Sequence, residues 1–328
     1  MARRTLLAAG DPDDPRDGST VTGASEITAR ARHRAAAVPP GPEGLSVWVT
    51  AQLAGPSQRR GRYVPESVRH PARMLPALAA HAIAAYTRPG DLVLDPMCGI
   101  GTTLVEAVHA GRDAIGVEYE SRWSDVADAN VAHAHRQGAT GRGSVIRGDA
   151  TMLTGLLPGV LHGAVALVVT SPPYGPTVHG LVRPTPGEGV AKSDNRYGED
   201  KGNLAYRDLP GLVDGFTDIL RGCATLLRPG GVVVVTARPW RKHGELVDLP
   251  SAVVAAGVAA GLTPIERCVA LLAAVRDGRL VARPSFFQLQ QVRRARATGV
   301  PMHLIAHEDV IVLAKGLPPG SDQVGEAA

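Results

Sequence analysis

Short apolar runs that end at glycine or proline alternate along this chain with longer amphipathic stretches. Residues 92–94 form one such run. A turn containing Gly99 and Gly101 follows it, and a helix is predicted from Thr102 onward. A strand, a tight glycine turn and a helix in this order point backbone N–H groups toward a ligand, although such turns also serve packing alone. Asp95 ends the strand, at the edge where open α/β sheets bind ligands.

The same patterning predicts the other elements. Strands are expected at residues 45–53, 114–117, 144–149, 167–170, 231–236, 265–272 and 307–315. Helices are expected at residues 77–86, 102–110, 121–135, 209–227 and 249–261. Patterning and composition alone therefore give an α/β class.

The apolar run at residues 167–169 ends against Pro172 and Pro173, which cannot continue a central strand. Ser171 is therefore expected at the carboxyl edge of the sheet. Two further strands end in the carboxylates Glu118 and Asp149. Polar groups from four strand ends should thus meet at one edge.

Two stretches carry a family resemblance. Residues 95–103, DPMCGIGTT, and residues 170–175, TSPPYG, resemble motifs I and IV of the amino-methyltransferases in both order and spacing. Members of that family use S-adenosylmethionine (SAM) to methylate exocyclic nitrogens, chiefly cytosine N4 and adenine N6 in DNA. The resemblance covers roughly residues 45–316. It implies a Rossmann-like class I methyltransferase fold, with a seven-stranded, mostly parallel sheet and an antiparallel last strand.

The resemblance also implies a set of residues that bind SAM. The His-Pro segment at His70 resembles motif X, which closes over the methionine part of the cofactor. Glu118 follows the glycine turn at the distance of the ribose-binding carboxylate, and Asp149 resembles the acceptor for the adenine amino group. Cys98 also reads as a small residue filling a tight bend, and Tyr119 is an alternative cover for adenine. The predicted set is His70, Asp95, Pro96, Cys98, Gly99, Gly101, Thr102, Glu118 and Asp149.

Catalysis is assigned to Ser171, Pro172, Pro173 and Tyr174. An aromatic amino group is a poor nucleophile, because its lone pair is delocalised into the ring. The Ser171 hydroxyl and the Pro172 carbonyl can accept the amino hydrogens, and Tyr174 offers a face for a flipped base. The family usually has Asp or Asn at position 171 for adenine and Ser for cytosine. Ser171 therefore favours cytosine N4, with no metal and no covalent intermediate.

Two insertions are candidates for binding the substrate, at residues 176–210 and 273–305. The first is rich in Gly, Pro and charge, is expected to be irregular, and offers Lys192, Arg196, Lys201 and Arg207 for phosphate contact, with Tyr197 nearby. The second sets Phe286 and Phe287 close to Arg293 and Arg294, which suits base stacking and backbone contact. Adjacent phenylalanines equally suit a core.

The amino-acid composition bears on the cellular compartment and on the possible partners of the protein. Three widely spaced cysteines suggest a reduced, cytoplasmic protein, and no metal-ligand spacing or membrane span is apparent. The net charge of +4 and the pI of about 9.1 permit a polyanionic partner without requiring one. Residues 1–44 and 317–328 lack sustained periodicity and are expected to be disordered tails.

Alternative functions remain open at this stage. A tRNA guanine-N2 methyltransferase shares this motif order, with RNA as partner, and adenine N6 in DNA is a second alternative. A non-catalytic protein that binds SAM or DNA is the non-enzyme alternative. The target sequence and any cognate restriction endonuclease cannot be read from these motifs.

Overall fold

The computed structural model describes residues 44–173, 181–185, 189–193, 197–198, 200, 202–242, 245–284 and 286–316. Of the predicted tails at 1–44 and 317–328, all but residue 44 lie outside these residues, as do Tyr174, Arg196 and Lys201. The side chains of Lys192, Phe286 and Phe287 also lie outside what the structure describes.

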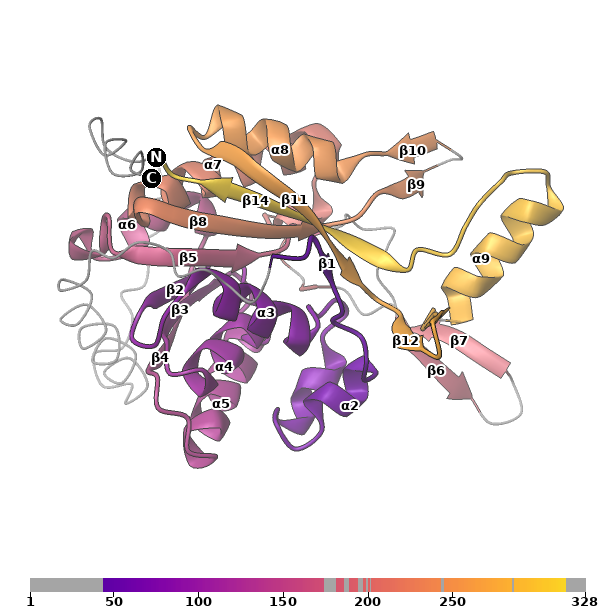
Figure 1. Cartoon of the computed structure of the whole chain (residues 1–328), viewed down its shortest axis with the longest axis horizontal. Helices are drawn as coiled ribbons and strands as arrows, with labels where there is room; N and C mark the ends of the chain where they lie inside the picture. Colours follow the sequence, from indigo (N-terminus) through magenta and orange to yellow (C-terminus); the bar gives the residue numbers. More distant parts are fainter. Residues whose placement is uncertain are drawn as a thin grey trace, which may run out of the picture.

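An eight-stranded sheet organises the fold, in the order β1-β11-β14-β8-β5-β2-β3-β4 (Figure 1). Only β14 runs against its neighbours, being antiparallel to both β11 and β8, whereas the other pairs are parallel. The strands are β1 Val47–Trp48, β2 Leu92–Asp95, β3 Asp113–Glu118, β4 Gly143–Arg147, β5 Val165–Thr170, β8 Leu227–Ala237, β11 Thr263–Leu271 and β14 His307–Ala314. This is the predicted α/β methyltransferase arrangement, with one strand more than the seven expected.

The additional strand is β1, at the edge of the sheet. Val47 and Trp48 pair in parallel with Val269 and Ala270 of β11. The sequence pattern predicts a strand at residues 45–53, and only two of those residues form it. Trp48 is buried and packs on the α3 side of the sheet, which explains why the chain holds this short segment against the edge.

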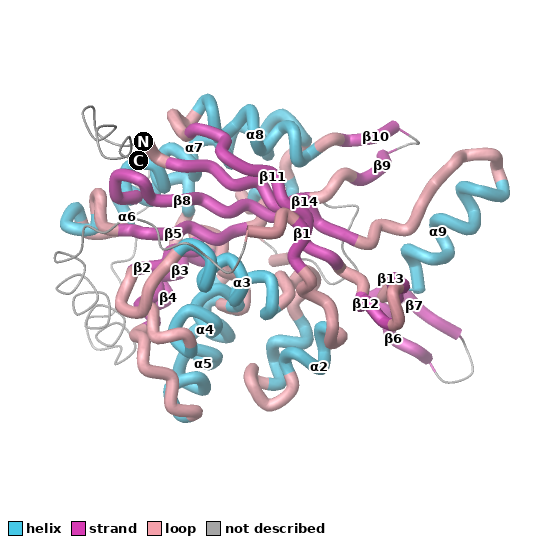
Figure 2. The backbone as a smooth tube through the Cα atoms, viewed as in Figure 1, coloured by secondary structure: helices cyan, strands magenta, loops and turns pink. Residues whose placement is uncertain are grey.

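Helices cover both faces of the sheet (Figure 2), and the central strands β2, β3 and β5 are buried along their whole length. One core lies between the sheet and α6, α7 and α8, and a second lies between the sheet and α3, α4 and α5. The helices are α2 Gly55–Arg59, α3 Pro76–Tyr86, α4 Thr102–His109, α5 Ser121–Arg136, α6 Leu153–Leu156, α7 Leu209–Leu226, α8 Leu249–Ala259 and α9 Phe286–Ala297. Among the described residues, none forms a helix that is both long and apolar enough to cross a membrane.

Helix starts follow local side-chain chemistry. Asp208 and Asp248 precede α7 and α8, and their carboxylates accept hydrogen bonds from the N–H groups of Gly211 (3.0 Å) and Ser251 (3.2 Å). Each cap satisfies a backbone donor that has no partner within its own helix. Both helices begin where the apolar pattern predicts them, at Leu209 and Leu249.

Short hairpins and turns occupy the insertions. The first insertion, expected to be irregular, contains the antiparallel strands β6 Leu181–Thr185 and β7 Gly189–Ser193 and the 3-10 turn η4 Leu204–Tyr206. The second contains the hairpin β12 Ala274–Arg276 and β13 Arg279–Val281, followed by α9, and it extends beyond the ends of β11 and β14 (Figure 1). The other short elements are β9 Trp240–Lys242, β10 Glu245–Val247, η1 Pro65–Arg69, η2 Ala150–Met152 and η3 Gly159–Leu161.

Candidate active site

A large pocket opens at the carboxyl ends of the parallel strands. Its volume is about 1360 Å³, above the roughly 300–1000 Å³ of most small-molecule sites. The space therefore suits a cofactor together with a second group. Many of the residues predicted from the sequence line it: His70, Asp95, Pro96, Cys98, Gly99, Thr102, Glu118, Asp149, Ser171, Pro172, Pro173, Tyr197, Arg207 and Arg294.

The glycine turn after β2 has the geometry that its sequence requires. Gly99 and Gly101 adopt φ values of +53° and +76°, in the left-handed region that side-chain-bearing residues avoid. A Cβ atom on Gly101 would lie 3.2 Å from the Cβ of Ala127 on α5. Gly101 therefore serves close packing against α5 as well as the turn that begins α4.

Cys98 fills the bend from inside. A Cβ atom on Gly116 of β3 would lie 2.7 Å from the Cys98 Sγ, so the missing side chain at position 116 makes room for this thiol. Burial, followed by the nearby Glu118, raises the pKa of Cys98 well above its usual value. The residue is thus a buried packing group at the floor of the pocket, in line with its reading as a small residue in a tight bend.

The Asp95 carboxylate stabilises the glycine turn between β2 and α4. It accepts hydrogen bonds from the Thr103 hydroxyl (2.7 Å) and from the Met97 N–H (3.2 Å). Burial raises its pKa to about 6, against the lowering effect of these bonds. The sequence places Asp95 at the strand end, but its partner Thr103, the second residue of α4, is apparent only in the structure.

Glu118 ends β3, the strand that pairs directly with β2. Its carboxylate accepts hydrogen bonds from the N–H groups of Gly99 (2.8 Å) and Glu120 (3.0 Å). Burial is the main cause that raises its pKa to about 7. Each carboxylate oxygen retains a second lone pair, so a ligand hydroxyl can still be accepted. The backbone of the glycine turn thus fixes the orientation of Glu118.

Asp149 lies at the end of β4 and is exposed at the pocket rim. Its Oδ1 accepts hydrogen bonds from both the N–H (2.9 Å) and the hydroxyl (2.8 Å) of Thr151. The side chain therefore caps the 3-10 turn η2 while its other oxygen faces no described partner.

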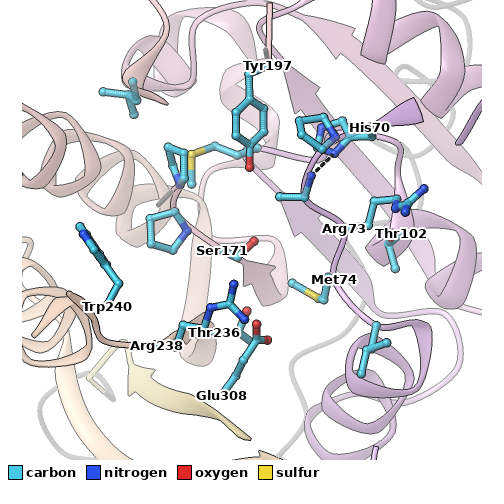
Figure 3. Close-up of a pocket in the computed structure, with 18 of the residues that line it drawn as sticks. His70, Arg73, Met74, Thr102, Ser171, Tyr197, Thr236, Arg238, Trp240 and Glu308 are labelled. Carbon is cyan, nitrogen blue, oxygen red and sulfur yellow. Dashed lines mark hydrogen bonds between the residues drawn. The ribbon is translucent and has the colours of Figure 1, made fainter. Parts of the chain in front are cut away.

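His70 closes one side of the pocket, although it lies in a segment far from the glycine turn in sequence (Figure 3). Its Nε2 lies 3.2 Å from the position that a Cβ on Gly99 would occupy. The Trp123 and Tyr197 rings stand edge-on to it, at centroid distances of 4.7 and 5.3 Å. Its Nδ1 accepts a hydrogen bond from the Ala72 N–H (3.3 Å). His70 is thus held by packing over the turn.

A buried polar network fastens the segment before His70 to the helices below. The Arg62 Nε and the Tyr63 hydroxyl donate to Glu106 of α4, at 2.8 and 2.7 Å. Asn130 of α5 donates to the Ser67 hydroxyl and to the Ile100 carbonyl, both at 2.8 Å. The sequence singles out Arg62 only as part of a basic loop, because its partner lies 44 residues away.

Tyr197 lies beside His70 and close to Glu118, whereas the sequence groups it with the residues that bind the substrate. Its carbonyl accepts a hydrogen bond from the Trp123 indole, and burial together with Glu118 raises the pKa of its hydroxyl. Close by, the Asn203 amide donates to Glu120 (2.9 Å). This part of the first insertion therefore covers the crevice beside Glu118.

Ser171 follows β5 and is half-buried at the centre of the pocket (Figure 3). His70 and Tyr197 lie on one side of it, and Thr236, Arg238 and Glu308 lie on the other. Pro172 is buried and Pro173 half-buried, so the chain turns away from the sheet directly after Ser171. Ser171 thus separates the two parts of the pocket.

The second insertion reaches the pocket through α9. Arg293 and Arg294 are both exposed, and only Arg294 lines the pocket. Arg276 and Arg283 fix the insertion to the core, because their guanidinium groups donate to the Gln52 carbonyl at 3.0 and 3.2 Å. These two arginines therefore position the insertion, and those of α9 are left facing solvent.

One segment of the chain is similar in sequence to known proteins. Residues 23–128 match the model of the DNA methylase family. A Type II methyltransferase, M.MthZI of Methanothermobacter thermautotrophicus, is 37% identical over 86 residues, covering 26% of this chain and 23% of that protein. A tRNA (guanine(10)-N2)-dimethyltransferase of Methanocaldococcus jannaschii is 35% identical over 107 residues, covering 32% of this chain and 30% of that protein.

The aligned segments thus span less than a third of each of these two relatives. Among solved structures, TrmN from Thermus thermophilus aligns with a TM-score of 0.46 and 19% identity, over 79% of this chain and 53% of that one. That likeness is too low to argue from. The strand order and the family match together confirm the predicted fold class, and the family match supports SAM as the cofactor.

Proposed function

Because the motifs and the DNA methylase match support membership of the SAM-dependent amino-methyltransferases, we propose that this chain methylates cytosine N4 in DNA. One observation carries the proposal. The glycine turn with Glu118 and the half-buried Ser171 open into one pocket from neighbouring strand ends. A ligand held by the turn and a base entering past Ser171 would meet there.

The residues of the turn fit the cofactor. Gly99 and Gly101 leave the turn without side chains, and Glu118 holds an oriented carboxylate suited to the ribose hydroxyls. Asp149 at the rim is placed for the adenine amino group, and His70 covers the turn. Bound SAM supplies an electrophilic methyl group.

The chain's own contribution to catalysis is orientation of the amino group. Ser171 accepts one amino hydrogen through its hydroxyl, and the Pro172 carbonyl accepts the other. The two prolines fix that backbone, so the acceptors are set before the base arrives. Tyr174, which lies outside the described residues, completes the predicted motif as the stacking face for a flipped base.

DNA contact is assigned to the second insertion. Residues 273–305 carry six arginines and one aspartate, a net charge of +5, whereas the whole chain carries +4. Positive charge is therefore concentrated in one segment beside the pocket. Exposed Arg293, Arg294 and Arg296 of α9 are placed for phosphates.

The deciding experiment is mass spectrometry of nucleosides after incubating unmethylated DNA, and separately tRNA, with the protein and SAM. We expect 4-methylcytosine in DNA. Finding 6-methyladenine instead would show that Ser171 does not select cytosine. Methylguanosine in tRNA alone would favour the tRNA reaction, which the relative from Methanocaldococcus jannaschii brings into consideration. SAM binding without any methyl transfer would favour a non-catalytic role.

A further inference from the structure

Side-chain alternation brings a charged pair to the far wall of the pocket. In the apolar core next to α3 and α4, β5 contributes Val169, β8 contributes Val234 and β14 contributes Val310. Successive side chains in a strand point to opposite faces. Two positions further toward the pocket, the three strands carry Ser171, Thr236 and Glu308, so these side chains point to the same face.

Arg238 continues this row by two more positions. Ala237 of β8 pairs with Asp309 of β14, so the next residues along, Arg238 and Glu308, follow opposite each other. Both line the pocket and are half-buried. Figure 3 shows the guanidinium of Arg238 and the carboxylate of Glu308 turned toward one another, with Ser171 facing the same space.

We propose that Arg238 is a specificity-determining residue that recognises the base edge beside the amino group accepted by Ser171. The inference rests on the proposed function and deepens it. An arginine side chain offers only donors, in a planar fork that suits two neighbouring acceptors. Beside its amino group, cytosine presents N3 and then O2, and both are acceptors. Arg238 can therefore donate to both.

The other two candidate bases do not match this donor pair. On either side of its amino group adenine presents a single acceptor, N1 or N7, followed by a C–H group. Guanine presents either the N1–H donor or the single acceptor N3 at the corresponding positions. A guanidinium facing that edge thus forms two hydrogen bonds with cytosine and fewer with adenine or guanine. The Arg238 side chain favours cytosine independently of the identity of residue 171.

Glu308 is the positioning residue for this contact. Its carboxylate faces Arg238 from the adjacent antiparallel strand (Figure 3), where a charge-assisted contact would fix the plane of the fork. Thr236 lies in the same row, is 1% exposed, and leaves little freedom beside the pair. The geometry holds Arg238 in place before a base enters.

The test compares Arg238→Met with wild type on unmethylated DNA, scoring 4-methylcytosine and 6-methyladenine by mass spectrometry and SAM affinity by calorimetry. We expect 4-methylcytosine formation to fall roughly tenfold to a hundredfold, as for loss of a bidentate base contact, with SAM affinity unchanged. Arg221→Met is the matched control. Arg221 is exposed on α7, is paired with Asp218, and lies outside the pocket.

The variant Glu308→Gln gives a product ratio that does not depend on how much of the protein is folded. We expect the ratio of 4-methylcytosine to 6-methyladenine to fall in this variant, because a loosened Arg238 discriminates less, whereas a smaller folded fraction would lower both products equally. Wild-type rates of 4-methylcytosine formation in Arg238→Met would overturn the inference and leave the proposed function standing. Absence of methylated DNA with wild-type protein would instead overturn the proposed function itself.

Discussion

The two parts of the pocket on either side of Ser171 are built differently. On the cofactor side, the candidate polar groups are bound by the backbone: Glu118 by the Gly99 N–H, Asp95 by the Met97 N–H, and His70 by the Ala72 N–H. On the substrate side, Arg238 and Glu308 face each other across two strands, and Arg293 and Arg294 are exposed on an inserted helix. In the first part the backbone orients the polar groups. The second part instead presents long side chains from two neighbouring strands and from an exposed helix.

The substitution Ser171→Ala should give the largest effect and should separate the two parts. It removes an acceptor for the amino hydrogen, which costs about 3 kcal/mol of transition-state stabilisation, or about a hundredfold in rate. SAM affinity should stay unchanged, because the hydroxyl serves the base. Single-turnover methylation and calorimetric titration measure the two quantities. A parallel loss of SAM affinity would show that the two parts are not independent.

Glu118→Ala tests the opposite side. Losing a charged acceptor from a closed site costs on the order of 1.5–3 kcal/mol, or about tenfold to a hundredfold in SAM affinity. Asp149→Ala is the matched control and should cost less, because Asp149 is exposed. Equal SAM affinity in wild type and Glu118→Ala, measured by calorimetry, would remove Glu118 from the ribose site.

The paired substitution Arg293→Ala with Arg296→Ala should weaken DNA binding and leave SAM affinity intact. If both side chains contact phosphates, the slope of log K against log salt should become shallower by nearly two, since each contact contributes about 0.9. Arg136→Ala with Arg221→Ala removes the same charge from exposed positions on α5 and α7. If this control changes the salt slope by the same amount, the loss of DNA binding is explained by net charge and not by contacts from α9.

A pH series should give the smallest effect. Burial raises the pKa of Glu118 from its usual value of 4.5 to about 7 and that of Asp95 from 3.8 to about 6. Between pH 4.5 and 7 the folded chain therefore binds more protons than the unfolded chain, and the stability of the ligand-free protein should fall as pH rises. SAM binding should strengthen over the same window, because the ionised Glu118 is the better acceptor.

The informative quantity is the pH slope of the melting temperature. Glu118→Gln should flatten this slope, because the group that titrates is removed. The Gln amide also places an N–H against one of the two backbone donors, so the variant should be less stable than wild type at every pH. An unchanged slope in this variant would assign the pH dependence to another group.

The sequence predicts the turn and the strand ends around the pocket because these signals are local. The turn around Gly99, the strand ends at Asp95 and Glu118, and α4 all follow from contiguous patterns. Two features depend on distant partners and are not predicted. Arg62 donates a hydrogen bond to Glu106 across 44 residues, and Arg238 faces Glu308 only because β14 runs antiparallel beside β8. The sequence also does not predict that Tyr197 lies beside His70, since no local pattern shows that the first insertion folds back toward Glu118.

The short edge strand β1 has a consequence for how copies of the molecule meet. Among the described residues, β1 covers only Val269 and Ala270 of β11, so the rest of β11 forms the outer edge of the sheet. That edge is a poor template for a strand from another copy. Pro264 lacks an N–H, the pairing with β14 is irregular between Pro264 and Glu266, and Glu266 and Arg267 follow as charged residues. These features oppose edge-to-edge aggregation. An α/β sheet can therefore end at this strand without a helix that covers its edge.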